Sequence, residues 1–415
     1  MLRIQTPDAC QPEKAYAFHV LFAEMLGVPY TLEYVPTGKE HVFALPNGQK
    51  WLVPDNFPAL FENHLGLVFP DEMAQNATFD PFSATFFMLS RWEEKRATTL
   101  DGHGRFPAAQ SLAAQMQFLN RPVVNEWADE IWTQLQQMGW AGERKKRSFQ
   151  VSFSCDVDHP RLWWSVADRL KTLAGALVKR MDFSEAGYWI KNHLFKAQDP
   201  YDVLAEWLVF LESQGIQAQF NFMGERPRNS DCWYPLKHPF IQRWMQKIAQ
   251  NGHKIGFHAS YEAFDKESVF QQELDSLRAV SPLPITSGRQ HYLRFANPAT
   301  WQMWESAGLL EDSTLGYPEA EGFRCGICHD FPVFDLEQRK MLRLREKPLI
   351  LMDVTLAQYR AYTPEEASEQ IRALRKTVQK YQGDFTVLWH NSSWNTPFWM
   401  PWKPVFRECI GEGTS

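Results

Sequence analysis

The sequence VSFSCDVDHP, from Val151 to Pro160, decides how the rest of the chain is interpreted. Phe149 to Cys155 alternates apolar and polar residues and is rich in β-forming types, which predicts a strand that ends before Pro160. Asp156 and Asp158 follow one residue apart. Like charges this close raise each other's pKa unless a cation or a proton lies between them. The stretch therefore indicates either a turn with solvated Asp residues or a site that uses both carboxylates.

Length and composition limit the class of protein. A chain of 415 residues predicts two domains. A net charge of −6 gives no reason to expect nucleic acid or an anionic membrane surface as a partner. The N-terminus lacks the pattern of a signal peptide, and no apolar run approaches membrane-spanning length. The six cysteines are scattered, which is typical of a reducing compartment, so we expect a cytoplasmic protein.

Residues 1–146 are expected to form a smaller α+β accessory domain. Helical spacing covers Ala15–Leu26, Phe82–Trp92 and Val124–Met138. Short strands are predicted at Tyr30–Val35, His41–Leu45 and Trp51–Val53, with Pro46–Gly48 as the turn of a hairpin.

From residue 147 to 415 the pattern becomes alternating strand and helix. The predicted strands are Phe149–Cys155, Ala218–Met223, Lys254–Phe257, Pro284–Arg289, Leu349–Thr355 and Phe385–Trp389. The predicted helices are Val203–Ser213, Phe240–Asn251, Ser268–Val280, Thr300–Ala307 and Pro364–Tyr381. Repeating β–α units imply parallel strands in a barrel or a doubly wound sheet. Arg161–Pro200 is expected to be a helical insertion.

Polar, chemically versatile residues recur where these strands end. They are Asp156, Asp158, His258, Arg289, His291, Asp353 and His390. A single His in an apolar run is more often a core residue than a ligand. Because α/β barrels and sheets build their sites at the carboxyl ends of strands, this recurrence favours a metal-dependent or acid–base site.

The motifs resemble those of the polysaccharide deacetylases of carbohydrate esterase family 4. The resemblance rests on Asp-x-Asp at Asp156, on GHKIGFH ending at His258, on the Arg motif at Arg289 and on Leu-x-His ending at His390. It implies a distorted (β/α)7 barrel and a divalent metal, most often Zn²⁺, with Co²⁺ or Ni²⁺ as alternatives. It also implies that Asp156 is the catalytic base, that Arg289 orients it and that His390 is the general acid, with Asp158 and His258 as metal ligands.

The chain departs from that family at the third metal ligand. The family has a second His four residues after the first, but Glu262 stands there. We expect His291 to replace it, with Glu262 as the alternative. The fourth motif, EDSTLGY from Glu311 to Tyr317, lacks the usual Trp-Asp pair. The stretches DPFSATFFMLSRWEE and DGHGRFP extend the resemblance to a bacterial subgroup with an added N-terminal domain.

Substrate contacts are expected from residues near the strand ends. Tyr292 and Arg294 follow Arg289, and Trp394 begins the Trp-rich tail WNTPFWMPW. These tail rings are either sugar platforms or side chains that pack the barrel rim against the N-terminal domain. CGICH, Cys325 to His329, fits the haem c attachment pattern, but we expect it to be a structured loop near the active site.

The sequence therefore predicts a metal-dependent N-deacetylase of an N-acetylated sugar or glycan, in surface polysaccharide or glycan metabolism. The alternatives are another amide hydrolase, acting on ureides or imides, and a carbohydrate-binding protein with a decayed site.

Overall fold

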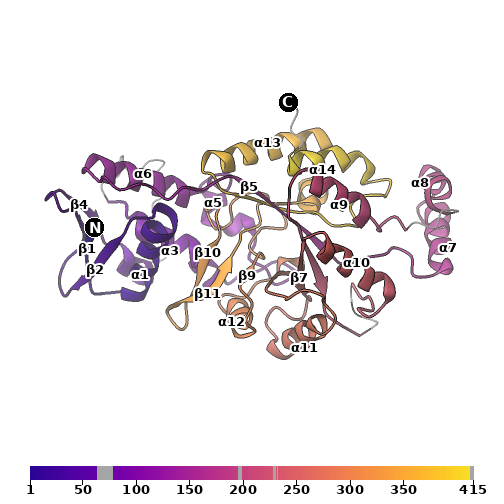
Figure 1. The fold of residues 1–415 in the computed structure, drawn as a ribbon, viewed down its shortest axis with the longest axis horizontal. Helices are drawn as coiled ribbons and strands as arrows, with labels where there is room; N and C mark the ends of the chain where they lie inside the picture. Colours follow the sequence, from indigo (N-terminus) through magenta and orange to yellow (C-terminus); the bar gives the residue numbers. More distant parts are fainter. Residues whose placement is uncertain (63–77, 195–198, 228–229, 231, 412–415) are drawn as a thin grey trace.

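The computed structural model describes residues 1–62, 78–194, 199–227, 230 and 232–411. Two β-sheets organise these residues, and Figure 1 shows them at different places along the long axis of the molecule. The smaller sheet lies within the first 146 residues and the larger within the remainder. The division into two domains at residue 146 stays a prediction.

The smaller sheet has four strands in the order β2-β1-β3-β4. Their bounds are β1 Leu2–Pro7, β2 Tyr30–Val35, β3 Glu40–Ala44 and β4 Lys50–Pro54. β3 and β4 form the predicted antiparallel hairpin. β1 was not predicted, although LRIQTP alternates buried and exposed residues along most of its length. The helices of this part are α1 Gln11–Phe18, α2 Phe57–Glu62, α3 Pro81–Leu89, α4 Trp92–Lys95, α5 Leu112–Gln115 and α6 Val123–Gln137.

A buried polar network fixes the start of α3 against this sheet. The Asp80 carboxylate accepts hydrogen bonds from the backbone N–H groups of Phe82 and Ser83, which caps the helix. The His41 imidazole lies 3.5 Å from that carboxylate and accepts or donates a 2.7 Å hydrogen bond with Thr6. The network therefore joins a helix end to β1 and β3.

The larger sheet has nine strands in the order β10-β11-β9-β8-β7-β6-β5-β13-β12. Their bounds are β5 Gln150–Val157, β6 Gln219–Met223, β7 Lys254–Ala259, β8 Ser287–Gln290, β9 Glu311–Asp312, β10 Phe331–Asp335, β11 Lys340–Glu346, β12 Leu351–Met352 and β13 Asp384–Leu388. Every neighbouring pair is parallel except β10–β11. The carboxyl ends of the parallel strands therefore meet at one edge.

Helices cover this curled sheet. They are α9 Leu204–Ser213, α10 Pro239–Gln250, α11 Glu267–Arg278, α12 Ala299–Ser306, α13 Pro364–Lys380 and α14 Lys403–Ile410. The first five coincide with predicted helices to within a few residues. α13 begins with a capping box in which the Thr363 hydroxyl and the Glu366 carboxylate each accept a backbone N–H of the other residue. α14, which follows the Trp-rich tail directly, was not predicted.

The fold is a mixed α/β arrangement, as predicted, but the closed seven-stranded barrel is not confirmed. Within the described ranges the sheet is open, since the end strands β10 and β12 do not pair with each other. The unpredicted antiparallel hairpin β10–β11 extends the sheet beyond β9. Its residues pack against the N-terminal part: the Phe334 ring contacts Tyr16 and Phe86.

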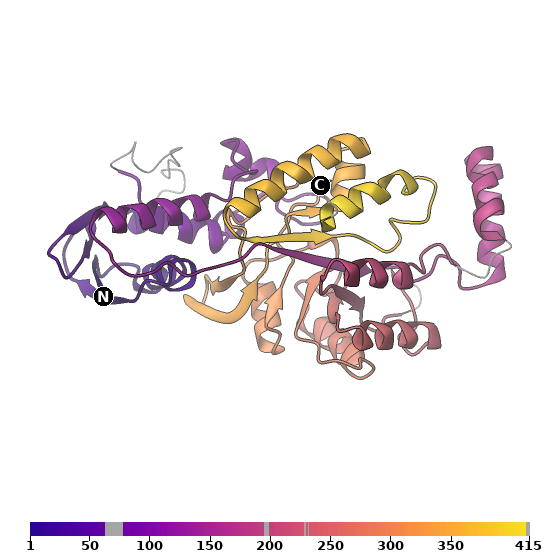
Figure 2. The same ribbon diagram turned by 45° about the horizontal axis from the view of Figure 1, so that its top comes forward.

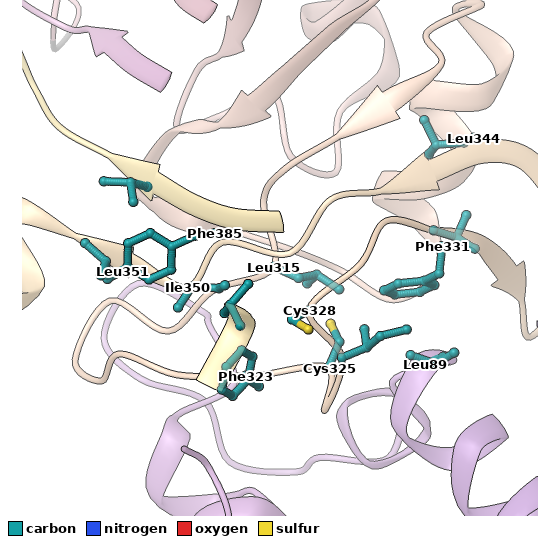
Figure 3. Close-up of a cluster of buried hydrophobic side chains, with 14 of the residues drawn as sticks. Leu89, Leu315, Phe323, Cys325, Cys328, Phe331, Leu344, Ile350, Leu351 and Phe385 are labelled. Carbon is teal, nitrogen blue, oxygen red and sulfur yellow. The ribbon is translucent and has the colours of Figure 1, made fainter. Parts of the chain in front are cut away.

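The CGICH stretch packs between the two parts of the chain. Figure 3 shows Cys325 and Cys328 within a cluster of buried apolar side chains. The backbone N–H of Cys328 donates to Asn125 of α6, and the Gly326 carbonyl accepts from Val124. The prediction of a structured loop is confirmed, but its placement near the active site is wrong, because the loop does not line the pocket described below.

The predicted helical insertion is present as α7 Val166–Ala174 and α8 Phe183–Trp189. The two helices stand apart from the rest of the chain in both ribbon views (Figures 1 and 2). No helix in the described part of the chain is long and apolar enough to cross a membrane.

Candidate active site

A pocket of about 440 Å³ opens at the edge where the parallel strands end. Asp156, Asp158, His258, His291 and His390 all line it. The prediction that these strand-end residues meet in one place is therefore matched by the geometry. The reason is that β5, β7, β8 and β13 run in the same direction within one sheet, so that their carboxyl ends converge.

Asp158, His258 and His291 offer three ligand atoms that all lie within 4.8 Å of one another. The Asp158 Oδ1 is 3.1 Å from the His258 Nε2, and its Oδ2 is 3.7 Å from the His291 Nε2. Burial disfavours ionisation of Asp158, but His291 and then His258 hold its pKa well below the usual range.

The His258 ring is oriented by a backbone carbonyl. Its Nδ1 lies 2.9 Å from the Arg289 carbonyl oxygen, which can only accept, so Nδ1 carries the proton. Burial opposes a charge on His258, but Asp156 and then Asp158 raise its pKa, and neither the Nε2 nor the Asp158 Oδ1 that faces it has a hydrogen-bond partner among the described residues. Two lone pairs at 3.1 Å are unfavourable unless a cation or a proton lies between them. The donor set therefore fits a divalent metal, with the orienting contact that metal-binding His residues usually have.

The chain's other strand-end carboxylate, Asp156, is held as an anion. Its Oδ1 accepts hydrogen bonds from Arg289 Nη1 at 3.0 Å and from the Asn221 carboxamide at 2.7 Å. Burial opposes ionisation, but Arg289, followed by His258 and His390, lowers the pKa of Asp156. Asp156 Oδ2 lies 3.7 Å from the His258 Nε2, next to the three candidate ligands.

Arg289 is fixed by four contacts of its own. Besides Asp156, it donates to the Ser154 hydroxyl, the Ser313 carbonyl and the Ser313 hydroxyl, at 2.7 to 3.0 Å. Ser313 belongs to the weak fourth motif, so that segment does serve the site by orienting the guanidinium.

His390 lies on another side of the pocket and is paired with Asp353. Its Nδ1 is 2.8 Å from the Asp353 Oδ1, and its backbone N–H donates to the other carboxylate oxygen at 2.9 Å. Burial opposes the charge on His390, but the Asp353 carboxylate raises its pKa to about 10. The His390 Nε2 faces Asp158 Oδ2 at 3.6 Å.

Glu262, the alternative third ligand, lies elsewhere. Its side chain is 52% exposed and forms a 2.9 Å ion pair with Arg226. It does not line the pocket, and it is outside the group of three ligand atoms.

Two of the three expected substrate contacts do not reach the pocket. Trp394 is buried against Trp207 and Phe406, and its indole N–H donates to Glu206. Arg294 stacks over Tyr261 and Phe264 and donates to backbone carbonyls. Only Tyr292 lines the pocket. Trp394 thus serves packing, but against α9 and α14 rather than against the N-terminal domain as the other interpretation had it.

Several residues in or beside the pocket were missed. Asn221 is a polar residue inside the buried strand β6, and that position was the signal that could have revealed it. A side chain at residue 256 would collide with its carboxamide, and Gly256 leaves the room. Cys232 lines the pocket with its Sγ 3.7 Å from the His291 Nε2, and nothing in the sequence pattern pointed to it.

Arg105 brings the N-terminal part of the chain to the pocket. It pairs with Asp101 and donates through Nη1 to the Tyr292 carbonyl at 2.9 Å. Tyr292 and Leu293 both have positive φ, 61° and 54°, directly after His291. The loop DGHGRFP therefore holds the strained turn that presents His291.

Comparison with known proteins gives one family match and one similar solved structure. Residues 2–139 match the model described as Family of unknown function (DUF7033). No curated protein matches the chain. A solved structure titled "Crystal structure of putative polysaccharide deacetylase from Mycobacterium smegmatis" is similar at 18% identity and a TM-score of 0.40, over 66% of this chain and 85% of that one. Similarity at this level carries no argument about activity, so the function is argued from the site.

Proposed function

We propose that this protein is a metal-dependent amide hydrolase that removes the N-acetyl group of a sugar. The observation that carries the proposal is the group of Asp158, His258 and His291, flanked by an ionised Asp156 and by a His390 paired to Asp353. A carboxylate and two imidazoles leave an open position on a zinc-like ion, which is the composition of catalytic rather than structural sites.

A bound ion of this kind would lower the pKa of a coordinated water and polarise the amide carbonyl. The chain's own residues supply the proton transfers. Asp156, held ionised by Arg289, accepts a proton from the attacking water. His390 is charged because of Asp353, and it donates a proton to the departing amine nitrogen. The water oxygen adds to the carbonyl carbon, the C–N bond breaks, and the products are acetate and a free amino sugar.

An N-acetylated sugar suits the pocket better than a purely apolar ligand. Tyr292 and Tyr359 line it and keep 38% and 46% of their surface exposed; the Tyr292 ring contacts His103, Tyr261 and His291, and the Tyr359 ring is the candidate to stack on a sugar face. The pocket floor is formed by carboxylates and imidazoles that can hydrogen-bond hydroxyl groups.

The test combines metal content with acetate release from N-acetylglucosamine oligosaccharides. We expect close to one equivalent of zinc, and acetate release that Asp156→Asn reduces by about 10²–10⁴-fold while the metal is retained. Metal content of less than about a tenth of an equivalent would rule the proposal out, because such sites hold their ion tightly. Loss of metal in Asp156→Asn would mean that base and ligand are wrongly assigned. Ammonia or ring-opened product from a ureide, without acetate from sugars, would favour the other amide hydrolase.

The third ligand is tested separately by zinc titration of His291→Ala and Glu262→Ala. We expect only the first to lose affinity, by about ten-fold or more. Glu262→Ala is the matched control, since its carboxylate is already engaged by Arg226. A loss confined to the Glu262 variant would refute the assignment of His291.

A further inference from the structure

Residues 161–191, which include α7 and α8, form a helical arm. In Figures 1 and 2 the arm projects away from the rest of the chain. Its own small core, made of Trp163, Ala176, Ala186 and Trp189, holds the two helices together. The arm is therefore folded without covering its outer face.

That outer face is apolar and exposed. Val166 and Leu170 on α7 are 74% and 57% exposed, and Val178 and Met181 beyond it are 78% and 72% exposed. Phe183, at the start of α8, is 76% exposed. A spacing of four residues places Val166 and Leu170 on one face of α7, and Val178 lies in the helical turn Gly175–Lys179 that follows it. Exposed large apolar side chains are ordinary when single, but a stripe of them indicates an interaction surface.

Basic side chains border the stripe. The arm holds six Lys or Arg residues against three Asp or Glu residues, although the whole chain carries a net charge of −6. Lys171 and Lys179 lie next to the apolar positions and are exposed. The negative net charge of the whole chain thus hides a local positive region. For this reason the composition gave no indication that an anionic membrane surface is a partner.

We infer that the helical arm binds the surface of a bilayer containing anionic lipids. An exposed apolar stripe bordered by Lys and Arg is the pattern of helices that lie in the membrane interface, with apolar side chains at the acyl boundary and ammonium groups at the phosphates. The positive charge of the arm is complementary to anionic lipid headgroups, and the arm projects from the rest of the chain (Figures 1 and 2).

The arm is also connected to the pocket. It begins directly after His159, which lines the pocket, and the Tyr188 hydroxyl donates to the Asn395 carbonyl in the segment that follows His390. A bound arm therefore keeps the pocket close to the bilayer. If the proposed function holds, the sugar substrate is one presented at a membrane surface.

The test is co-sedimentation of the full chain with vesicles. We expect binding to vesicles of phosphatidylcholine and phosphatidylglycerol that weakens with salt, and little binding to phosphatidylcholine alone. Leu170→Ser with Val178→Ser should reduce binding by about ten-fold or more, since each removes an aliphatic side chain from the interface. Lys171→Glu with Lys179→Glu should reduce it by at least about ten-fold, at about 1 kcal/mol per basic residue.

The matched control is Val209→Ser with Leu310→Ser, two apolar residues that are 70% and 56% exposed away from the arm. It should leave binding unchanged. Helical circular dichroism and thermal melting establish that each variant is folded. Failure of the folded wild-type chain to bind anionic vesicles overturns the inference, as does an equal loss in the control. A stable oligomer that dissociates in the Leu170 and Val178 variant, without vesicle binding, would assign the stripe to self-association instead. None of these measurements depends on hydrolysis, so they separate this inference from the proposed function.

Discussion

Replacing Arg105 by Ala should weaken metal binding, although Arg105 is not one of the three candidate metal ligands. The Arg105 guanidinium donates to the Tyr292 carbonyl at 2.9 Å, and its other N–H groups are fixed by Asp101. A hydrogen bond from a charged group contributes about 1.5–3 kcal/mol. Tyr292 and Leu293 adopt left-handed backbone conformations, which cost about 1–2 kcal/mol each outside glycine.

The two magnitudes are comparable, so loss of the Arg105 contact removes much of what offsets the strain in this turn. The turn can then relax, and His291 at its start moves away from Asp158. Displacing the support of a ligand typically lowers metal affinity by about 10–100-fold. We expect a loss in that range for Arg105→Ala, and a partial recovery for Arg105→Lys, which keeps one donor and the charge.

The measurement is competition for zinc between the metal-free protein and a chromophoric chelator. Arg144→Ala is the control, because Arg144 also lies before the central strand and pairs with an Asp, Asp129, and neither residue lines the pocket. It should bind zinc like the wild type. Unchanged zinc affinity in a folded Arg105→Ala protein would refute the reasoning, and so would a loss of equal size in Arg144→Ala.

Three further outcomes follow from buried carboxylates. Burial raises the pKa of Asp312 to about 7, and burial followed by Asp312 raises the pKa of its neighbour Glu346 well above the usual range, so the unfolded state ionises first and stability falls as the pH rises above about 4, by about 1.4 kcal/mol per pH unit for each proton; Asp312→Asn should reduce this slope in urea unfolding, and a variant-minus-wild-type difference that does not vary with pH would contradict it. Asp353→Asn should move the alkaline fall of the pH–rate profile to lower pH without loss of metal, because the carboxylate that raises the pKa of His390 is gone. An unchanged profile would show that Asp353 does not raise the pKa of His390. Asp80→Ala should lower the free energy of unfolding by about 1 kcal/mol or more, and Asp80→Asn, which keeps an oxygen to cap helix α3, should lower it by less. Equal losses in the two variants would show that Asp80 does not stabilise the protein by capping this helix.

Much of the α/β pattern could be predicted because it depends on the local order of apolar and polar residues. The strands β5, β6, β7 and β13 are short buried runs flanked by turn-forming residues, and the helices between them have apolar residues at helical spacing. β9 and β12, with two residues each, and the hairpin β10–β11 depend on pairing with distant strands. No local periodicity reveals such pairing.

The sequence by itself placed Asp156, Asp158, His258, Arg289 and His390 at strand ends, because strand termini and parallel direction follow from local pattern and from the rules of β–α units. It left the choice between His291 and Glu262 open.

Only the tertiary structure distinguishes the surroundings of those two residues: Glu262 pairs with Arg226, and the His291 Nε2 lies 3.7 Å from Asp158. The tertiary structure also buries Trp394 and brings Arg105, from the N-terminal part of the chain, to the pocket. The physical reason is the same in each case. Which charge a side chain meets, and whether it is covered, depends on segments that are remote in the chain and adjacent only after folding.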